Sequence, residues 1–369
     1  MKKALIIAYN DLNNSGVPNV IYQTVKALHS EYIFDILIFK DDEYYYKKLQ
    51  TEGFNVNLIR YEDKKPKSRF LKLFWWFHVM PKQHYDFAKK LLKEKEYSVI
   101  HSFKEYYSWP FFKAAKELGI KKRILHRNIN RKYPRQLIIK LLEKKNRKLS
   151  IKYASNLVGV SKLSCEYAFK KNKYSVLYNC YDEDKYNLNI RNKLNSDELV
   201  VTQVASYGEN KNQLFSLEVL KELLKLHKNT RLNLVGLNGK SLYFDRLLEY
   251  TKTNNLENYV SFIQKSDCVE KIYESTTFTI LPSFSEGLPL TIIEAQACGI
   301  IVFASSNVTN EVNCGCVKFL HLDEGPEAWA NYIYKTFMSN NNKRFECNVQ
   351  KFSFKNFRSN LMLLYSDNN

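Results

Sequence analysis

The 369-residue chain lacks several features that would assign its class at once. It has no run of about 18 apolar residues, so we expect no membrane-spanning helix. The apolar run near the N-terminus, Ala4 to Ala8, is too short for a secretory signal, and we interpret it as a first buried strand. No internal repeat and no low-complexity segment is found. The length and a hydrophobic fraction of 45% favour two globular domains.

The seven cysteines do not form the pattern of a secreted disulfide framework. Their number is odd and their spacing is irregular. Cys314 and Cys316 are the closest pair, but no second Cys/His pair with zinc spacing accompanies them. We therefore expect free thiols in a reducing cytosol, and hence a cytoplasmic protein.

Acidic residues are scarce in the first half of the chain. Up to Lys185 there are 38 Lys and Arg against 19 Asp and Glu, whereas the remainder has 19 of each. The formal charge of +19 thus lies entirely in the first half, which suggests two domains with different roles, the first meeting an anionic partner. Charge and 14% aromatic content would also suit a nucleic-acid-binding protein, but no helix-turn-helix, zinc-finger or RNA-recognition motif supports that alternative, and we expect no nucleic acid partner.

Short apolar runs alternate with helical patterns in both halves, which is typical of parallel sheets covered by helices on both faces. We predict an α/β fold of two Rossmann-like domains whose strand ends face a central cleft for a phosphorylated ligand. The predicted domains are residues 1–185 and 186–350, followed by a C-terminal helix within 351–369 that returns to the first domain. The predicted strands lie in 4–9, 32–39, 54–59, 97–102, 122–126, 156–161, 199–206, 230–236, 259–263, 276–283, 300–305 and 316–322.

The stretch "LPSFSEGLPLTIIEAQACGI" carries two carboxylates eight positions apart. A strand ends near Leu281, a turn follows, and Pro289 suits the first turn of a helix. Glu286 is then expected in the loop and Glu294 within the helix. Gly287 lets a ligand approach the backbone, and the free N–H groups of the helix start suit a diphosphate. A carboxylate deeper in such a pocket can accept hydrogen bonds from the hydroxyls of a sugar.

This Glu-x7-Glu pattern, within "PSFSEGLPLTIIEAQACGIIVFAS", closely resembles the signature of retaining glycosyltransferases with the GT-B fold, family 4, also called glycosyl transferases group 1. The resemblance implies that Glu294 holds the ribose of a nucleotide and that Glu286 contacts the transferred sugar. It also implies a donor pocket lined by Ser285, Gly287, Leu288 and Pro289.

A second stretch, "VASYGENKNQ", resembles the basic loop of the same family. Lys211 and Asn212 match, and the resemblance implies that Lys211 holds the diphosphate of the donor and offsets the charge of the leaving group. Ala205 and Ser206 stand where the family has Gly and Arg. Either another residue supplies the second cation or the diphosphate is held less tightly.

The first half resembles the family in "LNNSGVPNVI" and in one strand end. Gly16 corresponds to a glycine loop that would offer backbone N–H groups to the donor, although an ordinary strand-to-helix turn explains it equally well. His126 best matches the family's histidine that contacts the transferred sugar, and His101 is the second candidate. Neither imidazole is needed as a proton-abstracting base.

The resemblance implies a hexosyl or related transferase that moves a sugar, with retention, from a nucleotide-diphosphate sugar to a lipid-linked or oligosaccharide acceptor in capsule, O-antigen or exopolysaccharide synthesis. No cofactor and no essential metal is expected. Because of the change at Ser206, a GT-B protein that hydrolyses, epimerises or only binds a nucleotide sugar remains the alternative.

Two basic segments of the first half are interleaved with apolar and aromatic residues, at 64–82 and 131–148. This composition suits an anionic membrane surface, so we expect a peripheral protein on the inner face of the cell membrane. The alternative is that Trp75 and Trp76 belong to the core and that the lysines are simply solvated.

Overall fold

The computed structural model describes residues 1–8, 12, 16–40, 43–68, 71, 74–128, 137–188, 197–236, 241–264, 268–340 and 344–366. Most of the predicted glycine loop before Gly16 and residues 131–136 of the predicted basic segment lie outside these ranges. The chain forms two compact units. The first comprises Met1–Cys180 and Phe354–Asn369, and the second comprises Tyr181–Ser353, whereas the sequence placed the boundaries after residues 185 and 350.

The first unit contains a parallel sheet with the strand order β3-β2-β1-β4-β5-β6-β7. The six strands that the apolar runs predict in this half are all present, and β7 is a further strand of two residues. The strands are β1 (Lys2–Ile7), β2 (Tyr32–Ile38), β3 (Val56–Arg60), β4 (Val99–Ser102), β5 (Lys122–Arg127), β6 (Asn156–Gly159) and β7 (Ser175–Val176).

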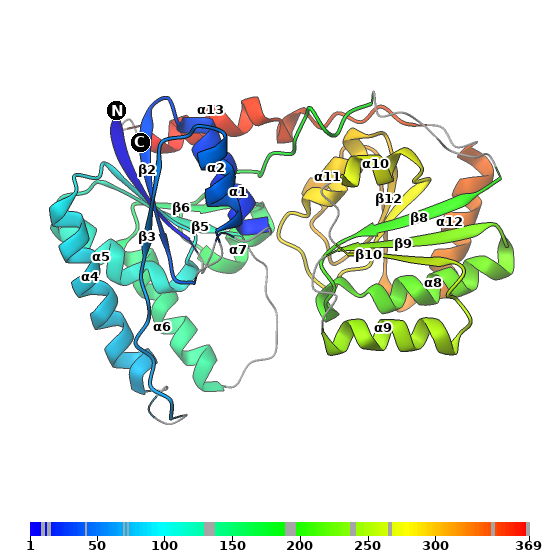
Figure 1. Ribbon diagram of the computed structural model, residues 1–369, viewed down its shortest axis with the longest axis horizontal. Coiled ribbons are helices and arrows are strands. Elements are labelled where there is room, and N and C mark those ends of the chain that lie inside the picture. Colours follow the sequence, from blue (N-terminus) through cyan, green and yellow to red (C-terminus); the bar gives the residue numbers. More distant parts are fainter. Residues whose placement is uncertain are drawn as a thin grey trace. The chain divides into compact units, whose positions relative to one another are not determined.

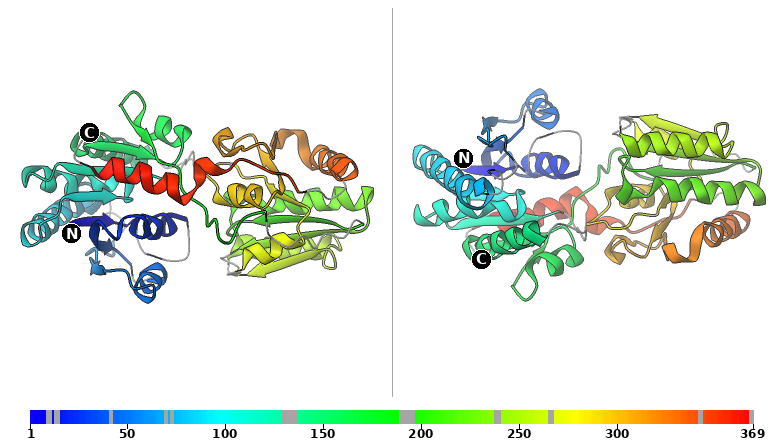
Figure 2. Two further views of the ribbon diagram at one scale, coloured as in Figure 1. Left: turned by 90° about the horizontal axis from the view of Figure 1, so that it is seen from above. Right: turned by 90° about the horizontal axis from the view of Figure 1, so that it is seen from below.

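Helices cover both faces of this sheet (Figures 1 and 2). Successive side chains of a strand point to opposite faces, so Ile6 of β1 joins one core and Leu5 and Ile7 join the other. The first core is covered by α1 (Gly16–Leu28), α2 (Tyr44–Thr51) and α13 (Phe354–Tyr365). The second is covered by α4 (Met80–Glu94), α5 (Trp109–Glu117), α6 (Leu137–Tyr153) and α7 (Lys162–Phe169). Short helical turns are η1 (Trp75–Val79) and η2 (Glu105–Ser108).

Helix α13 is the last element of the chain, yet it belongs to the first unit. Leu361 and Tyr365 are buried in the same core as α1. Arg358 donates hydrogen bonds to the carbonyl of Ala27 at 2.9 Å and to the carboxylate of Glu31 at 2.7 Å. The C-terminal residues are therefore an integral part of this unit.

The second unit contains a parallel sheet with the order β10-β9-β8-β11-β12-β13. Each strand predicted in this half is present, and two parallel-sheet domains are thus confirmed. The strands are β8 (Leu199–Val204), β9 (Thr230–Gly236), β10 (Val260–Gln264), β11 (Phe278–Leu281), β12 (Ile301–Ser305) and β13 (Val317–Leu320).

The helices of the second unit again form layers on the sheet (Figure 1). One core is built from the strands together with α8, α9 and α12, and the indole of Trp329 is completely buried in it. The helices are α8 (Gln213–Leu226), α9 (Leu242–Thr253), α10 (Val269–Glu274), α11 (Leu290–Ala297) and α12 (Gly325–Asn340), and the short turns are η3 (Glu209–Lys211), η4 (Asn310–Val312), η5 (Leu322–Glu324) and η6 (Gln350–Phe352). Within the described ranges, no helix combines the length and the apolar character that crossing a membrane requires.

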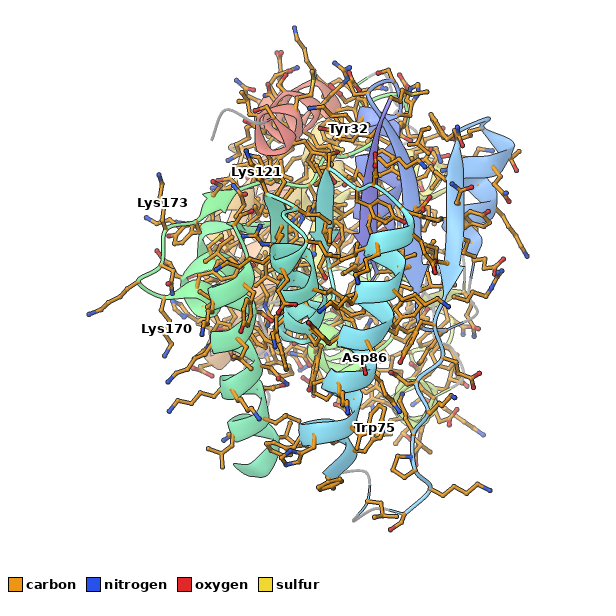
Figure 3. All side chains as sticks on the ribbon, turned by 90° about the vertical axis from the view of Figure 1, so that its left-hand side faces the viewer. Tyr32, Trp75, Asp86, Lys121, Lys170 and Lys173 are labelled. Carbon is orange, nitrogen blue, oxygen red and sulfur yellow. A yellow bond between two sulfur atoms is a disulfide. The ribbon has the colours of Figure 1, made fainter. Side chains whose placement is uncertain are left out.

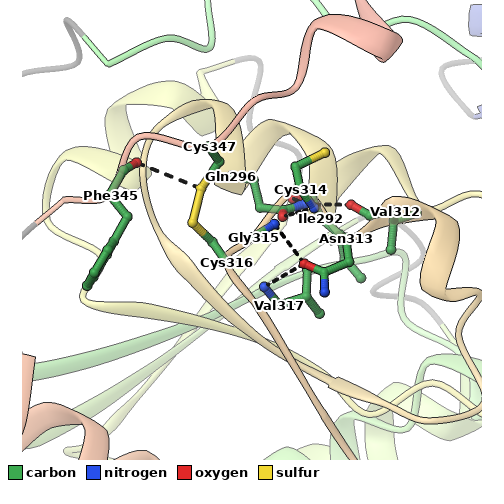
Figure 4. The surroundings of a disulfide bond; sticks show 10 residues. All are labelled: Ile292, Gln296, Val312, Asn313, Cys314, Gly315, Cys316, Val317, Phe345 and Cys347. Atoms are coloured by element: carbon green, nitrogen blue, oxygen red, sulfur yellow. Dashed lines mark hydrogen bonds between the residues drawn. A yellow bond between two sulfur atoms is a disulfide. The ribbon is translucent and has the colours of Figure 1, made fainter.

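The expectation that all cysteines are free thiols was wrong, because Cys316 and Cys347 form a disulfide (Figure 4). The fold brings the segment after α12 back beside β12 and β13. The N–H of Phe345 donates to the carbonyl of Gly299 at 2.9 Å, and Arg344 donates to the carbonyl of Tyr273 at 2.7 Å. The tertiary fold brings these two cysteines together, and their spacing in the sequence does not indicate the pairing.

Candidate active site

The predicted donor residues of the second unit lie at the point where the strand order of its sheet reverses. Strands β8 and β11 are neighbours, and the chain leaves them toward opposite edges of the sheet. The segments that follow these two strands are hydrogen-bonded to each other. Asn210 donates to the carbonyl of Ser285 at 2.7 Å, the N–H of Phe284 donates to the carbonyl of Asn210 at 2.9 Å, and Asn212 donates to the carbonyl of Pro282 at 3.2 Å. In open parallel sheets, ligands bind outside the strand ends at such a point.

Lys211 and Glu286, which are 75 residues apart in the sequence, form an ion pair here. The Lys211 Nζ lies 2.6 Å from Glu286 Oε1, and the exposed fractions of the two side chains are 25% and 9%. A carboxylate this deeply buried requires a charged or hydrogen-bonding partner. The backbone of Lys211 is fixed in turn, because Gln203 donates to its carbonyl at 2.7 Å. The pair thus joins the two predicted motifs in one place.

The loop that carries Glu286 is packed into the unit. Gly287, Leu288 and Pro289 are buried, and Ser285 is partly exposed. Pro289 is the residue immediately before α11, with an extended backbone, and α11 begins at Leu290. The helix start therefore lies directly after the predicted pocket residues, as the sequence indicates.

Glu294 lies in the middle of α11 and is partly buried. Burial, together with the charges of Asp182 and Glu270, raises its pKa to about 7, although Lys185 acts in the opposite direction. Near neutral pH the protonated and the ionised carboxyl group are therefore both populated. The ionised form can accept two hydrogen bonds from a vicinal diol.

Several residues around Glu294 were not identified from the sequence. The phenols of Tyr186 and Tyr273 lie near its charge, and their ring centroids are 6.0 Å apart. Glu270 comes from α10, a segment without a recognisable motif. Asp182 begins a turn, and its carbonyl accepts from the N–H groups of Lys185 and Tyr186.

The basic loop after β8 lacks the arginine that the family resemblance would place at Ser206. Ser206 is exposed, and its carbonyl accepts a hydrogen bond from Gln213 at 3.0 Å. Gly236 ends the adjacent strand β9, and a Cβ atom there would lie 2.0 Å from the carbonyl oxygen of Ala205. The glycine is thus required for the close approach of β9 to this loop.

The predicted residues of the first unit are placed differently. Gly16 begins α1, and a Cβ atom there would meet nothing within 4 Å. His126 is the penultimate residue of β5 and is completely buried, and burial lowers its pKa to about 3. Its Nδ1 lies 3.0 Å from His101 Nε2, so the two histidine candidates form one hydrogen-bonded pair.

A second polar cluster of this unit was also missed. Lys104, which follows β4, is buried with its Nζ 3.0 Å from the ring centroid of Phe39. Burial lowers its pKa to about 7. Nearby, His84 Nε2 lies 2.7 Å from Asp63 Oδ1. Phe39, Asp63 and Lys104 lie in the loops after three different strands and His84 lies in α4, and no local pattern connects them in the sequence.

Comparison with known proteins agrees with this geometry. Residues 185–350, which include both segments at the reversal point, match the family model described as Glycosyl transferases group 1. This part of the chain is thus similar to the group 1 glycosyltransferases.

Three curated glycosyltransferases are similar to parts of this chain. EpsF of Bacillus subtilis, named as a glycosyltransferase, is 29% identical over 151 residues, which are 40% of this chain and only 38% of that protein. The capsular polysaccharide biosynthesis glycosyltransferase CapH of Staphylococcus aureus is 28% identical over 67% of this chain and 70% of its own length. An α-1,4-N-acetyl-D-galactosaminyltransferase of Campylobacter jejuni, whose name includes a saccharide linked to PP-undecaprenol, is 26% identical over 83% of this chain and 79% of its own length.

Solved structures match both units. A glycosyltransferase from Rickettsia africae superimposes with a TM-score of 0.76 at 16% identity and covers all of both chains. Anabaena HepE in complex with UDP and glucose has a TM-score of 0.73 at 14% identity, over 98% of this chain and 99% of its own. At these identities the comparison establishes the fold, and the predicted GT-B architecture is confirmed.

Proposed function

We propose that this protein is a retaining glycosyltransferase that moves a sugar from a nucleotide-diphosphate sugar to a lipid-linked or oligosaccharide acceptor in the synthesis of a surface polysaccharide. The ion pair between Lys211 and Glu286 is the observation that supports it most directly. It places one cation and one hydrogen-bond-accepting carboxylate beside the start of α11, in the domain that matches the glycosyltransferase family. Solved structures of HepE are complexes with UDP and glucose and with UDP-glucose, which supports a uridine nucleotide donor.

In the proposed reaction, the bond between the anomeric carbon and the diphosphate oxygen breaks while the acceptor oxygen bonds to the same face of that carbon. The proton of the acceptor hydroxyl passes to the departing phosphate oxygen. Lys211 and the N–H groups at the start of α11 stabilise the negative charge of the diphosphate. Glu286 and Glu294 hold hydroxyls of the sugar and of the ribose, which keeps the reacting atoms aligned. Neither step needs a protein base or, in this proposal, a metal.

The test is incubation of the purified protein with UDP-, GDP- and other nucleotide sugars in the presence of a polyprenyl-diphosphate-linked saccharide. Formation of a longer lipid-linked product with the anomeric configuration of the donor supports the proposal. Release of free sugar without acceptor, or epimerised donor, would support the hydrolase or epimerase alternative instead. Nucleotide release that persists in the Lys211→Ala variant would contradict the assigned role of this lysine.

The lipid-linked acceptor suggests a membrane-bound substrate, and one surface of the first unit suits it. Leu71, Phe74 and Leu141 are exposed large apolar residues beside the exposed lysines of α6, and the Nζ of Lys145 lies 5.8 Å from the ring centroid of Phe77. Trp75 is buried, so one tryptophan of the predicted pair belongs to the core (Figure 3). Exposed apolar side chains among lysines favour an anionic membrane. The proposed location is the inner face of the cell membrane. The exposed lysines are Lys140, Lys144, Lys145 and Lys148.

Flotation with vesicles tests this surface. We expect the protein to float with anionic vesicles and not with neutral ones, and the Lys144→Glu/Lys145→Glu double variant to lose binding. The matched control is Lys170→Glu/Lys173→Glu, because these two exposed lysines of the same unit lie away from Trp75 (Figure 3). If both double variants lost vesicle binding equally, the binding would depend on net charge alone, which would contradict a specific membrane-binding surface.

A further inference from the structure

Three buried side chains of the first unit form a continuous hydrogen-bonded chain. The hydroxyl of Tyr365 in α13 lies 2.9 Å from His101 Nδ1, and His101 Nε2 lies 3.0 Å from His126 Nδ1. His101 on β4 pairs with Ile124 on β5, so His126, two residues further along, points to the same face of the sheet. That face is the one covered by α13, which explains why a residue 264 positions away reaches His101.

The two imidazole rings are held in one plane. Their planes differ by 6° and their centroids are 5.2 Å apart, and with nitrogens at 3.0 Å the rings meet edge to edge. Phe103 packs against both rings, with centroids 4.4 Å from His101 and 4.8 Å from His126. This geometry suits a linear N–H···N hydrogen bond.

Both histidines are uncharged in this position. Each is completely buried, burial lowers the pKa of both, and the neighbouring His126 lowers the pKa of His101 further. A neutral imidazole carries one proton, on one of its two nitrogens, so each ring has one donor and one acceptor. The donor-to-acceptor direction of both hydrogen bonds is therefore the same, and it is set by the residue at one end that can act in only one way.

The constrained end is the phenol of Tyr365. Among the described residues, His101 Nδ1 is the sole partner of this buried hydroxyl. If His101 donated to the phenol oxygen, two buried groups would stay unsatisfied, namely the phenol proton and the lone pair of His126 Nε2. The reverse direction leaves a single unsatisfied group, the N–H of His126 Nε2, and is therefore favoured. If the phenol donates to Nδ1, His101 carries its proton on Nε2 and donates it to His126 Nδ1. His126 then carries its own proton on Nε2.

We propose that Tyr365 is a positioning residue that fixes the tautomer of His126, so that His126 Nε2 presents an N–H donor to an oxygen of the sugar substrate. This rests on the proposed function of the protein. In the structure His126 Nε2 is buried and has no partner within the described ranges, and a buried polar atom without a partner is rare. A sugar hydroxyl or ring oxygen would accept this bond. With its proton on Nε2, His126 has no free lone pair there and cannot act as a base.

The tautomer can be measured without substrate. Long-range 1H–15N spectra of the full-length protein distinguish protonated from unprotonated ring nitrogens, and His126→Gln and His101→Gln variants assign the signals. We expect His101 Nε2 and His126 Nε2 to be protonated in the wild type. In Tyr365→Phe the donor is lost, and we expect the signals of both rings to shift toward a mixture of tautomers. A wild-type spectrum with unprotonated His126 Nε2 would overturn the proposal, as would an unchanged spectrum of the variant.

Tyr32→Phe is the matched control. The Tyr32 hydroxyl donates to the backbone carbonyl of Tyr365 at 3.3 Å and its ring packs edge-on against Tyr365. Tyr32 therefore contacts the same helix without taking part in the hydrogen bonds to the histidines. The control is expected to leave the histidine signals unchanged. In the transferase assay, Tyr365→Phe should lower kcat about three- to tenfold, the order expected for one hydrogen bond, with little change in the KM of the donor. The spectra report on the tautomer even if the protein proves to have another activity, so the two proposals fail separately.

Discussion

The two polar clusters of this protein differ in their charge and in their exposure to solvent. In the second unit, Lys211 and Glu286 are a charged pair that keeps partial access to solvent. In the first unit, Tyr365, His101 and His126 are an uncharged chain with no access to solvent. Charged groups can bind and stabilise a diphosphate, whereas neutral buried groups can only orient a partner through their hydrogen bonds. The proposed reaction therefore assigns the stabilisation of charge to the second unit and the orientation of the sugar to the first.

The most severe expected effect is the loss of Lys211. In Lys211→Ala, the negative charge of the leaving diphosphate loses the cation proposed to stabilise it, so we expect transfer to fall by about 10² to 10³-fold. Steady-state kinetics with the donor identified in the screen measure this. Lys225→Ala is the control, because this lysine lies on the same unit in an exposed pair with Glu222. If the transfer rate of Lys211→Ala fell by less than about threefold, the charged cluster would have no larger effect than the neutral one, and the comparison would fail.

Removal of the disulfide should destabilise the second unit without changing the first. The crosslink joins residues 31 positions apart, and closing a loop of this size contributes about 3 to 4 kcal/mol. Denaturant unfolding of Cys347→Ser should show this loss, while the histidine tautomers stay as in the wild type. Cys314→Ser is the matched control, since Cys314 is a free thiol next to the same bridge. Equal stability of both variants would show that the bridge contributes nothing.

Glu294 should make donor binding depend on pH. Its pKa rises from 4.5 to about 7, so the carboxylate that accepts the ribose hydroxyls is lost below pH 7, and affinity should fall by up to tenfold for each further pH unit. Calorimetric titrations between pH 5.5 and 8.5 measure this, and Glu294→Gln should bind weakly with no such dependence.

The raised pKa of Glu294 affects folding stability in the opposite pH direction. Because this pKa is higher in the folded than in the unfolded protein, the protonated carboxyl group makes its full contribution to the free energy of unfolding below pH 4.5. This contribution is lost as the pH rises through about 7. Glu294→Gln should therefore unfold at higher denaturant concentration than the wild type at pH 8 and lose this advantage at pH 4.5. The reverse order would mean that Glu294 is paired with a cation in the folded protein.

The smallest expected effect is a gain. Ser206 is exposed in the basic loop, where the family resemblance places an arginine. Ser206→Arg should tighten donor binding about three- to tenfold, since one added charge-assisted hydrogen bond is formed to the diphosphate. Ser206→Gln controls for side-chain size. No gain in the arginine variant would mean that another cation of this protein already occupies that role.

The sequence predicted the strands well because each is a short apolar run between turns, as in 278–281. Strand β7 was missed because Ser175 and Val176 form no such run. Glu286 and Lys211 could be identified because each belongs to a local motif that matches a family. Tyr365 and the disulfide could not, since their partners are 264 and 31 residues away and meet only through the tertiary fold.

Helix α13 has a consequence for how the protein is made. The first 180 residues leave the ribosome early, but the core of their sheet includes Leu361 and Tyr365. The contact between Tyr32 and Tyr365 spans 333 positions. Until α13 has been synthesised, one apolar face of the nascent first unit stays uncovered, and the second unit can fold before the first is complete. The segment proposed to orient His126 is thus synthesised after the whole of the second unit.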